Sequence, residues 1–148
     1  MKPTARPNTL PEVLARQGYR LTGPRRAILA VLGTGDGPLT VEEIRARLDS
    51  DSAHRVTVYR TVHVLVRAGI LRAVDAGREG LRYEMGEPFT GHHAFLICQQ
   101  CGRIDTTPGC PLPDKVLARL RRRLERVHQF RVVDHEVRLL GLCHTCHV

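Results

Sequence analysis

The chain has 148 residues, enough for one ordinary domain or two small ones, and its formal net charge is +8. All but two of its 23 basic residues are arginine, and the excess of positive charge indicates a polyanionic partner. No apolar run approaches the about 20 residues that span a bilayer, and the N-terminal MKPTARPNTL lacks the apolar stretch of a signal peptide. We therefore expect a cytoplasmic protein with no membrane partner, a setting in which its five cysteines are more naturally thiolate ligands than disulfides.

The first half of the chain predicts short helices followed by a hairpin. Apolar residues recur at helical spacing in LPEVLARQGYR, GPRRAILAVL, TVEEIRARL and RVTVYRTVHVLVRA, which cover residues 10–20, 23–32, 40–48 and 55–68. Thr40 and Glu43 form a capping-box pattern at the start of the third segment. ILRAV and LRYEM then flank the turn DAGREG, which predicts a β-hairpin. This order is typical of a winged helix-turn-helix, in which the helix over 55–68 would enter the major groove of DNA.

The second half, after the expected linker EPFTG, predicts an α+β arrangement. HAFLIC and GRIDTT are typical of short strands, and PLPDKVLARLRRRLERVH predicts a helix with one apolar face. FRVVDHEVRLLG predicts a long strand in which His135, Val137 and Leu139 share a face. We expect the basic run RLRRRLER to be the solvated face of the helix rather than a nucleic-acid site.

Two cysteine pairs give the strongest chemical indication in the sequence. Cys98 and Cys101 form one C-x2-C motif, and Cys143 and Cys146 form a second one near the end of the chain. The two-residue gap lets both sulfurs of a motif face one ion, so two motifs complete a tetrahedral shell of four thiolates. Such a closed shell suits structural zinc, and neither pair opens a helix as a redox C-x-x-C does. Cys110 is left over as a loop thiol, free by default, with metal binding or redox sensing as alternatives.

Several motifs together resemble the ferric uptake regulator superfamily of bacterial metalloregulators. They are GYRLTGPRRAIL, TVEEI, TVYRTV, RYE, GHHAFLICQQCG and DHEVRLLGLCHTC, and the match spans about Leu10 to Cys146. The resemblance implies a homodimer in which residues 1–87 form a winged-helix DNA-binding domain and residues 88–148 an α+β dimerisation and metal-binding domain. It also implies a metal-responsive transcriptional regulator, a repressor of palindromic operators in double-stranded DNA, and not an enzyme. In such a protein metal binding favours the arrangement that binds DNA.

The resemblance assigns DNA-binding roles to five residues. TVYR matches the recognition-helix motif, where Tyr59 would contact a thymine methyl group and Arg60 a phosphate. Arg20 matches a basic position that enters an A·T-rich minor groove. Arg55 and Thr57, the latter the first residue of TVYR, lie at the start of this helix and would reach the DNA backbone or bases. The alternative for Tyr59 is a place in the apolar core.

The resemblance also assigns the metal ligands. The four paired cysteines match the structural zinc ligands, and a second divalent metal, which is Fe, Mn, Zn or Ni, is expected as the effector. For the effector, Glu84 and His93 match ligands of a hinge site, while His92 and His135 match ligands of a second site. Relatives often have further ligands at the two positions after His93, which here are alanine and phenylalanine. Each site therefore keeps about two recognisable ligands, fewer than the about four to six of a firm transition-metal site.

Three arrangements of the effector site are open at this point. A single composite site would use Glu84, Glu87, His92, His93 and His135, with Asp105 or Cys110 as further candidates. A hinge site would be completed by unusual residues of the first domain, such as His54, His63 or Asp75. In the third arrangement the protein no longer senses metal.

Other functions are weighed against metal-responsive regulation. Peroxide sensing through iron-catalysed oxidation of a ligand histidine is an alternative within the family. A zinc-dependent hydrolase, with His92 and His93 as ligands and Glu84 or Glu87 as general base, is an alternative outside it. Adjacent histidines on a strand point to opposite faces, and the chain lacks an H-E-x-x-H motif, which disfavours the hydrolase. The TVYR motif and the basic charge disfavour a zinc-stapled dimerisation protein with no DNA role.

Overall fold

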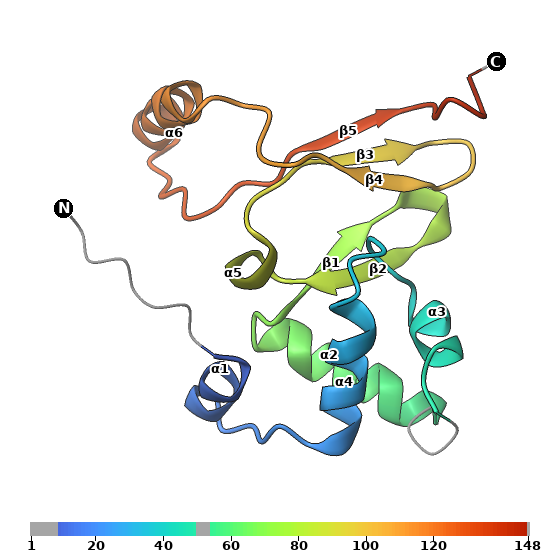
Figure 1. Cartoon of the computed structure of the whole chain (residues 1–148). Helices are drawn as coiled ribbons and strands as arrows, with labels where there is room; N and C mark the ends of the chain where they lie inside the picture. The colour runs from blue at the N-terminus through green and yellow to red at the C-terminus, as the bar shows by residue number, and fades with distance from the viewer. Residues whose placement is uncertain (1–8, 50–53, 148) are drawn as a thin grey trace. The chain divides into compact units, whose positions relative to one another are not determined.

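The computed structural model describes residues 9–49 and 54–147. The chain forms two compact units that divide between Gly91 and His92 (Figure 1). The boundary expected after residue 87 falls inside a short helix, α5 (Glu87–Thr90), in the segment expected to be a linker. None of the described helices has the length and apolar character that crossing a membrane requires.

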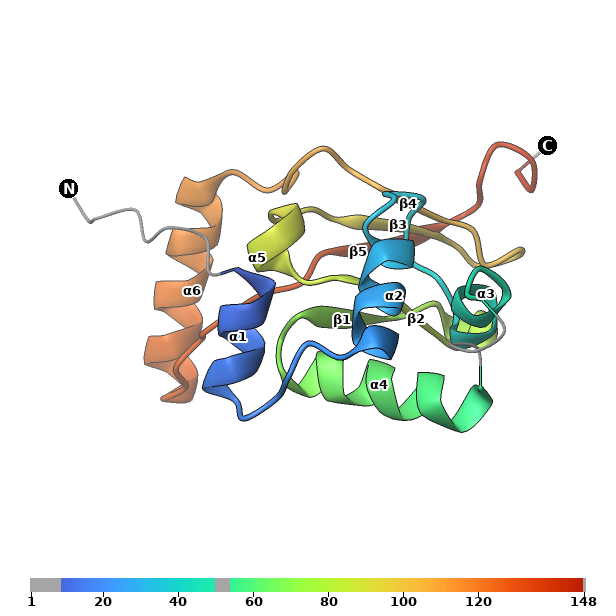
Figure 2. The ribbon, with the colours of Figure 1, turned by 60° about the horizontal axis from the view of Figure 1, so that its bottom comes forward.

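The helices of the N-terminal unit pack around one apolar core. They are α1 (Leu10–Arg16), α2 (Gly23–Leu32), α3 (Val41–Ala46) and α4 (Arg55–Arg67). Figure 2 shows α2 crossing α4, and the residues that α4 buries, Val58, Thr61, Val62 and Leu65, recur at helical spacing along one face. The apolar stripe of α4 is thus committed to the core, which leaves its other face for a partner.

A hairpin completes the N-terminal unit. It pairs β1 (Leu71–Asp75) with β2 (Leu81–Met85) in antiparallel register around a short 3-10 turn, Gly77–Glu79. Leu39 adds a bridge to Tyr83, with two backbone N–H···O=C bonds of 2.9 and 2.7 Å. A helix α4 preceded by α3 and followed by such a hairpin is the arrangement of a winged helix-turn-helix.

The start of α3 is fixed by the capping box expected from the sequence. The Thr40 hydroxyl accepts a 3.1 Å bond from the Glu43 N–H, and the Glu43 carboxylate accepts a 2.8 Å bond from the Thr40 N–H. Arg82 on β2 donates to the same carboxylate at 2.9 Å. Partial burial opposes ionisation of Glu43, but the bonds from Thr40 and the charge of Arg82 outweigh it and lower the pKa of Glu43. The hairpin is therefore tied to α3 by an ionised side chain.

The C-terminal unit has a small mixed sheet of order β4-β3-β5. β3 (Phe95–Cys98) pairs antiparallel with β4 (Ile104–Thr106) and parallel with β5 (Arg138–Gly141), with Cys98 opposite Gly141. Between β4 and β5 lies α6 (Asp114–His128), none of whose residues is buried. The unit is α+β, as expected.

The predicted strand over FRVVDHEVRLLG was wrong for most of its length. Only Arg138–Gly141 forms a strand, β5, and residues 130–137 have no regular secondary structure. β-branched residues are frequent in this segment, which favours a strand. A strand also needs a neighbouring strand to pair with, and its partner β3 is only four residues long. His135 therefore lies in a loop, and His92 and His93 likewise precede β3 rather than alternate along it.

Candidate metal centres and nucleic-acid interface

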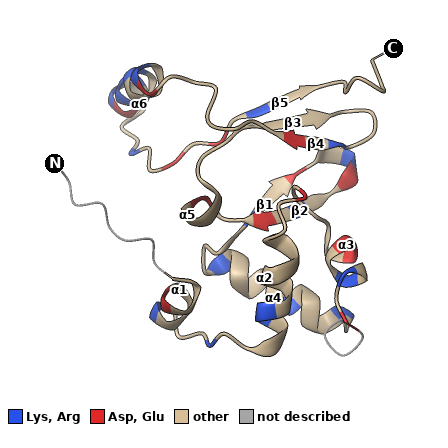
Figure 3. Ribbon diagram, in the orientation of Figure 1, with Lys and Arg blue, Asp and Glu red and all other residues tan. Residues whose placement is uncertain are grey.

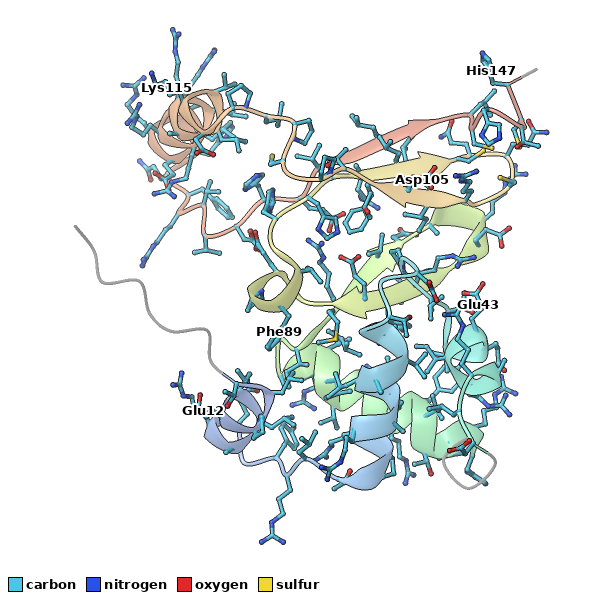
Figure 4. All side chains as sticks on the ribbon, in the orientation of Figure 1. Glu12, Glu43, Phe89, Asp105, Lys115 and His147 are labelled. Atoms are coloured by element: carbon cyan, nitrogen blue, oxygen red, sulfur yellow. The ribbon has the colours of Figure 1, made fainter. Side chains whose placement is uncertain are left out.

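The four cysteines of the C-x2-C motifs lie together at one end of the three-stranded sheet. The parallel pairing of β3 with β5 brings the turns that follow the two strands side by side. One ligand atom from each of Cys98, Cys101, Cys143 and Cys146 lies within 4.8 Å of all the others. The Sγ atoms of Cys101 and Cys143 are 3.7 Å apart, and the Cys143 N–H donates to the Cys98 sulfur at 3.3 Å. Figure 4 shows yellow sulfur atoms gathered near the labelled His147.

The electrostatics of this cluster favour a bound cation. Backbone N–H groups of Cys101 and Cys143 lower the pKa of the Cys98 thiol to about 6. The hydrogen bond with Cys143, burial and the other thiols raise the pKa of Cys146 to about 12. Burial opposes ionisation of Cys143, but hydrogen bonds from Cys146 outweigh it and lower the pKa of Cys143 too. Thiolates therefore form readily at Cys98 and Cys143, whereas ionising Cys146 as well is opposed unless a cation compensates the charge. Four thiolates in a closed group are the donor set of structural zinc, so the residues present fit that ion.

A second cluster joins three residues of the C-terminal unit that are far apart in the sequence. The ligand atoms of His92, Cys110 and His135 all lie within 4.8 Å of one another. Cys110 Sγ is 3.8 Å from His135 Nε2, and the imidazole rings of His92 and His135 have their centroids 4.2 Å apart. The sequence indicated Cys110 only as one of two further candidates, beside Asp105, because no fixed spacing links it to either histidine.

Glu84 and His93, the other expected effector ligands, are in neither ligand cluster of the described residues. Glu84 lies opposite Arg72 in the hairpin and accepts a 2.9 Å bond from its guanidinium Nε. His93 is buried and packs edge-on against Phe95, with the ring centroids 5.1 Å apart. Ala94 and Phe95 are fully buried. The two positions at which relatives often have ligands thus serve the apolar interior here.

The residues expected to contact DNA lie on the open side of α4. Tyr59 is 45% exposed although its neighbour Val58 is fully buried, so it is not a core aromatic. Arg55 and Arg60 are exposed and Thr57 is partly exposed. The Arg55 guanidinium lies 5.7 Å from the centroid of the Tyr59 ring, which places a cation and an aromatic face together. Figure 3 marks basic residues along α2, α4 and α6.

Arg20, expected in the minor groove, lies between α1 and α2. Its side chain is exposed, and its backbone carbonyl accepts a bond from the Arg25 guanidinium. The same Arg25 guanidinium lies 5.2 Å from the centroid of the Tyr19 ring. The segment before α2 therefore has a fixed backbone from which Arg20 projects.

Apolar side chains are exposed along α6, in the loop that follows it, on the edge strand β5 and at the residue after β5. The largest of them are Val116, Leu120, Leu124, Val127, Phe130, Val133, Leu139, Leu140 and Leu142. The α6 members recur at helical spacing, so they form one stripe. An apolar stripe on a helix and an unpaired strand edge are each typical of a surface for association rather than for water.

Comparisons with known proteins cover both units. A model of the ferric uptake regulator family matches residues 16–140. The ferric uptake regulation protein of Synechococcus elongatus is 30% identical over 138 residues, which cover 90% of this chain and 89% of that protein. The peroxide-responsive repressor of Staphylococcus saprophyticus is 30% identical over 135 residues, with 90% and 86% covered. A solved structure of a zinc-bound manganese uptake regulator matches with a TM-score of 0.59 at 32% identity and covers 89% of this chain and 96% of that one. The expected fold class, a winged helix-turn-helix followed by an α+β unit, is confirmed.

Proposed function

Because this chain belongs to the ferric uptake regulator family, we propose that it is a metal-responsive transcriptional repressor that binds palindromic operator DNA as a homodimer. One observation carries the proposal. The chain combines an exposed, basic reading face on a winged helix with two separate clusters of metal-ligating side chains. The family match also supports regulation rather than catalysis.

DNA recognition is assigned to the exposed face of α4. Tyr59 offers an aromatic edge for the methyl group of thymine, and Arg60 offers a guanidinium for a phosphate. Thr57 and Arg55 lie at the start of the helix, which is the end that recognition helices direct at base edges. Arg20 supplies a charge suited to a narrow minor groove.

Dimer formation is assigned to the apolar stripe of α6 together with the edge of β5. A helix that buries none of its own residues gains little by folding unless a partner covers it. A second copy of the chain offers the same stripe, and in a dimer with a two-fold axis the same patch of both subunits forms the interface. The two-fold axis would then present two winged helices to successive major grooves of a palindrome.

Two metal roles divide between the two clusters. Cys98, Cys101, Cys143 and Cys146 hold structural zinc, which fastens the end of the chain to the turn after β3. His92 and His135 belong to the effector site. An effector that binds the DNA-competent arrangement more tightly than the alternative shifts the population towards it, and by linkage DNA then raises the affinity for the effector.

The test combines metal analysis with DNA binding. Elemental analysis should find one zinc per chain that resists a chelator, and a gel-shift assay with the promoter next to the protein's own gene should show binding that a second metal restores after chelation. Binding should weaken steeply as salt rises, because arginine–phosphate contacts release counterions. Affinity for duplex DNA that does not change with salt would contradict the proposal.

Peroxide-responsive repression is the second candidate. The 30% identity to the Staphylococcus saprophyticus repressor is as high as that to the Synechococcus elongatus regulator, so sequence likeness alone does not separate the two. Mass spectrometry of the iron-loaded protein after peroxide exposure distinguishes them. An oxygen atom added to His92 or His135, together with loss of DNA binding, supports the peroxide response. Unmodified histidines support metal sensing.

A further inference from the structure

We propose that Cys110 is the third protein ligand of the effector site, and that its thiolate makes the site selective for zinc over iron and manganese. This inference rests on the proposed function, since it names the metal for the same site. It starts from the cluster of His92, Cys110 and His135 in the C-terminal unit.

The distances match a tetrahedral ion. A zinc–sulfur bond of about 2.3 Å and a zinc–nitrogen bond of about 2.0–2.1 Å at the tetrahedral angle separate the two donor atoms by about 3.6 Å. Cys110 Sγ lies 3.8 Å from His135 Nε2. The donor atom of His92 lies within 4.8 Å of both. Small rotations of the side chains therefore bring all three donors to bonding distance of one ion.

The loop that holds Cys110 is anchored next to His92. Thr107 on this loop donates its backbone N–H to the Ala94 carbonyl at 3.0 Å and accepts the Ala94 N–H on its hydroxyl at 2.9 Å. The Thr107 hydroxyl also donates to the carbonyl of Gly109, the residue before Cys110. Prolines on both sides, Pro108 and Pro111, restrict the backbone further. The thiol is thus placed by the same short segment that places His92, without help from an ion.

The donor set selects the metal by number and by softness. Iron(II) and manganese(II) favour about six nitrogen and oxygen donors, whereas this site offers two imidazoles and one thiolate, and no described carboxylate joins them. Zinc accepts three protein ligands and one water in a tetrahedron, and it binds thiolates well. Cys110 is partly exposed and His135 is exposed, so water and metal reach the site. The buried Ala94 and Phe95 cannot supply the missing hard ligands.

Cobalt(II) spectroscopy tests the ligand assignment. The full-length protein, with its four-cysteine site already filled by zinc, is titrated with cobalt(II). The expected result is a thiolate-to-cobalt charge-transfer band with tetrahedral ligand-field bands, saturating at one cobalt per chain. Cys110→Ser should abolish the charge-transfer band and weaken zinc binding at this site by at least about 100-fold, more than the loss of an outer partner of a ligand. His128→Ala, an exposed histidine outside the cluster, is the matched control and should leave the spectrum unchanged.

Metal competition tests the selectivity. The wild type should prefer zinc to manganese(II) strongly, and Cys110→Asp, which supplies a hard donor at the same position, should narrow that preference. An octahedral cobalt spectrum without a charge-transfer band, or manganese binding as tight as zinc binding, would overturn the inference. Metal-dependent DNA binding that is intact in Cys110→Ser would overturn it too while leaving the proposed function standing. A charge-transfer band in a protein whose DNA binding does not depend on metal would support Cys110 as a metal ligand but contradict the proposed function.

Discussion

The sulfur atoms of Cys101 and Cys143 lie 3.7 Å apart, although 42 positions separate the two residues in the chain. Their contact depends on the parallel pairing of β3 with β5, and each of these strands is only four residues long. A short edge strand is held weakly by its own backbone bonds, so we expect the metal site to contribute much of the stability of this end of the unit.

Cys143→Ser should therefore remove the structural zinc and destabilise the C-terminal unit. Structural zinc supplies about 10 kcal/mol or more of binding free energy in small domains, so a loss of several kcal/mol in the free energy of unfolding is expected. Zinc content and chemical denaturation measure the two effects. His147→Ala is the control next to the same motif. A Cys143→Ser protein with a full zinc content would show that the four-cysteine site is wrongly assigned.

Tyr59→Ala should weaken operator binding without unfolding the protein. The side chain is 45% exposed and outside the core, so its removal should change stability by less than about 0.5 kcal/mol. Loss of a contact to a base edge should cost about 1–3 kcal/mol of specific binding and little non-specific binding. Arg67→Ala, at the far end of α4, is the control. Competition with unrelated duplex DNA measures the two affinities, and equal losses for both would remove Tyr59 from sequence reading.

Arg60→Ala should act differently on the same helix. A phosphate contact carries no sequence information, so binding should weaken for all sequences alike. The slope of log affinity against log salt should fall by about one, because one fewer counterion is released. Fluorescence anisotropy over a range of salt concentrations measures this slope. An unchanged slope would place Arg60 away from the DNA backbone.

Glu43→Gln should make the protein less stable above about pH 5 and equally stable in strong acid. The pKa of Glu43 is lowered in the folded protein, so its ionised form stabilises the fold above the ordinary value of 4.5. This contribution disappears as the pH falls through the lowered pKa. The side chain is 44% exposed, so solvent screens its bond to Arg82 and the effect is small. Denaturation of both proteins between pH 3 and 7 should show curves that converge at low pH, with Glu42→Gln as the control.

Leu120→Asp should disrupt the dimer. It puts a charge into the centre of the apolar stripe on α6, which would be desolvated between two subunits. Leu81→Asp changes an equally exposed leucine of the hairpin and should leave the oligomeric state unchanged. Analytical ultracentrifugation compares the two variants with the wild type. A dimeric Leu120→Asp protein would move the interface away from α6.

Local patterns in the sequence predicted most elements of the fold. Thr40 and Glu43 predicted the start of α3, and the glycine at position 69 predicted the end of α4. Helix caps and left-handed turns depend on residues that are close together in the sequence, so local patterns indicate them. The two-residue spacing within each C-x2-C motif likewise lets both of its sulfurs face one ion. Cys110 could not be assigned in this way, since its neighbours in space, His92 and His135, come from distant segments whose approach depends on how β3, its loop and β5 pack together. The overlong strand prediction before β5 had the same origin.

Metal-dependent binding to the promoter beside the protein's own gene tests the central claim most directly. The measurement is fluorescence anisotropy of that duplex with protein whose four-cysteine site is filled with zinc, with and without further zinc for the second site. It compares the wild type with His135→Ala and with the His128→Ala control. We expect added zinc to raise the affinity of the wild type and of the control by at least about fivefold, the lower range of allosteric coupling, and to leave His135→Ala unaffected. Equal affinity of the wild type with and without effector metal, whichever divalent ion is supplied, would contradict the account.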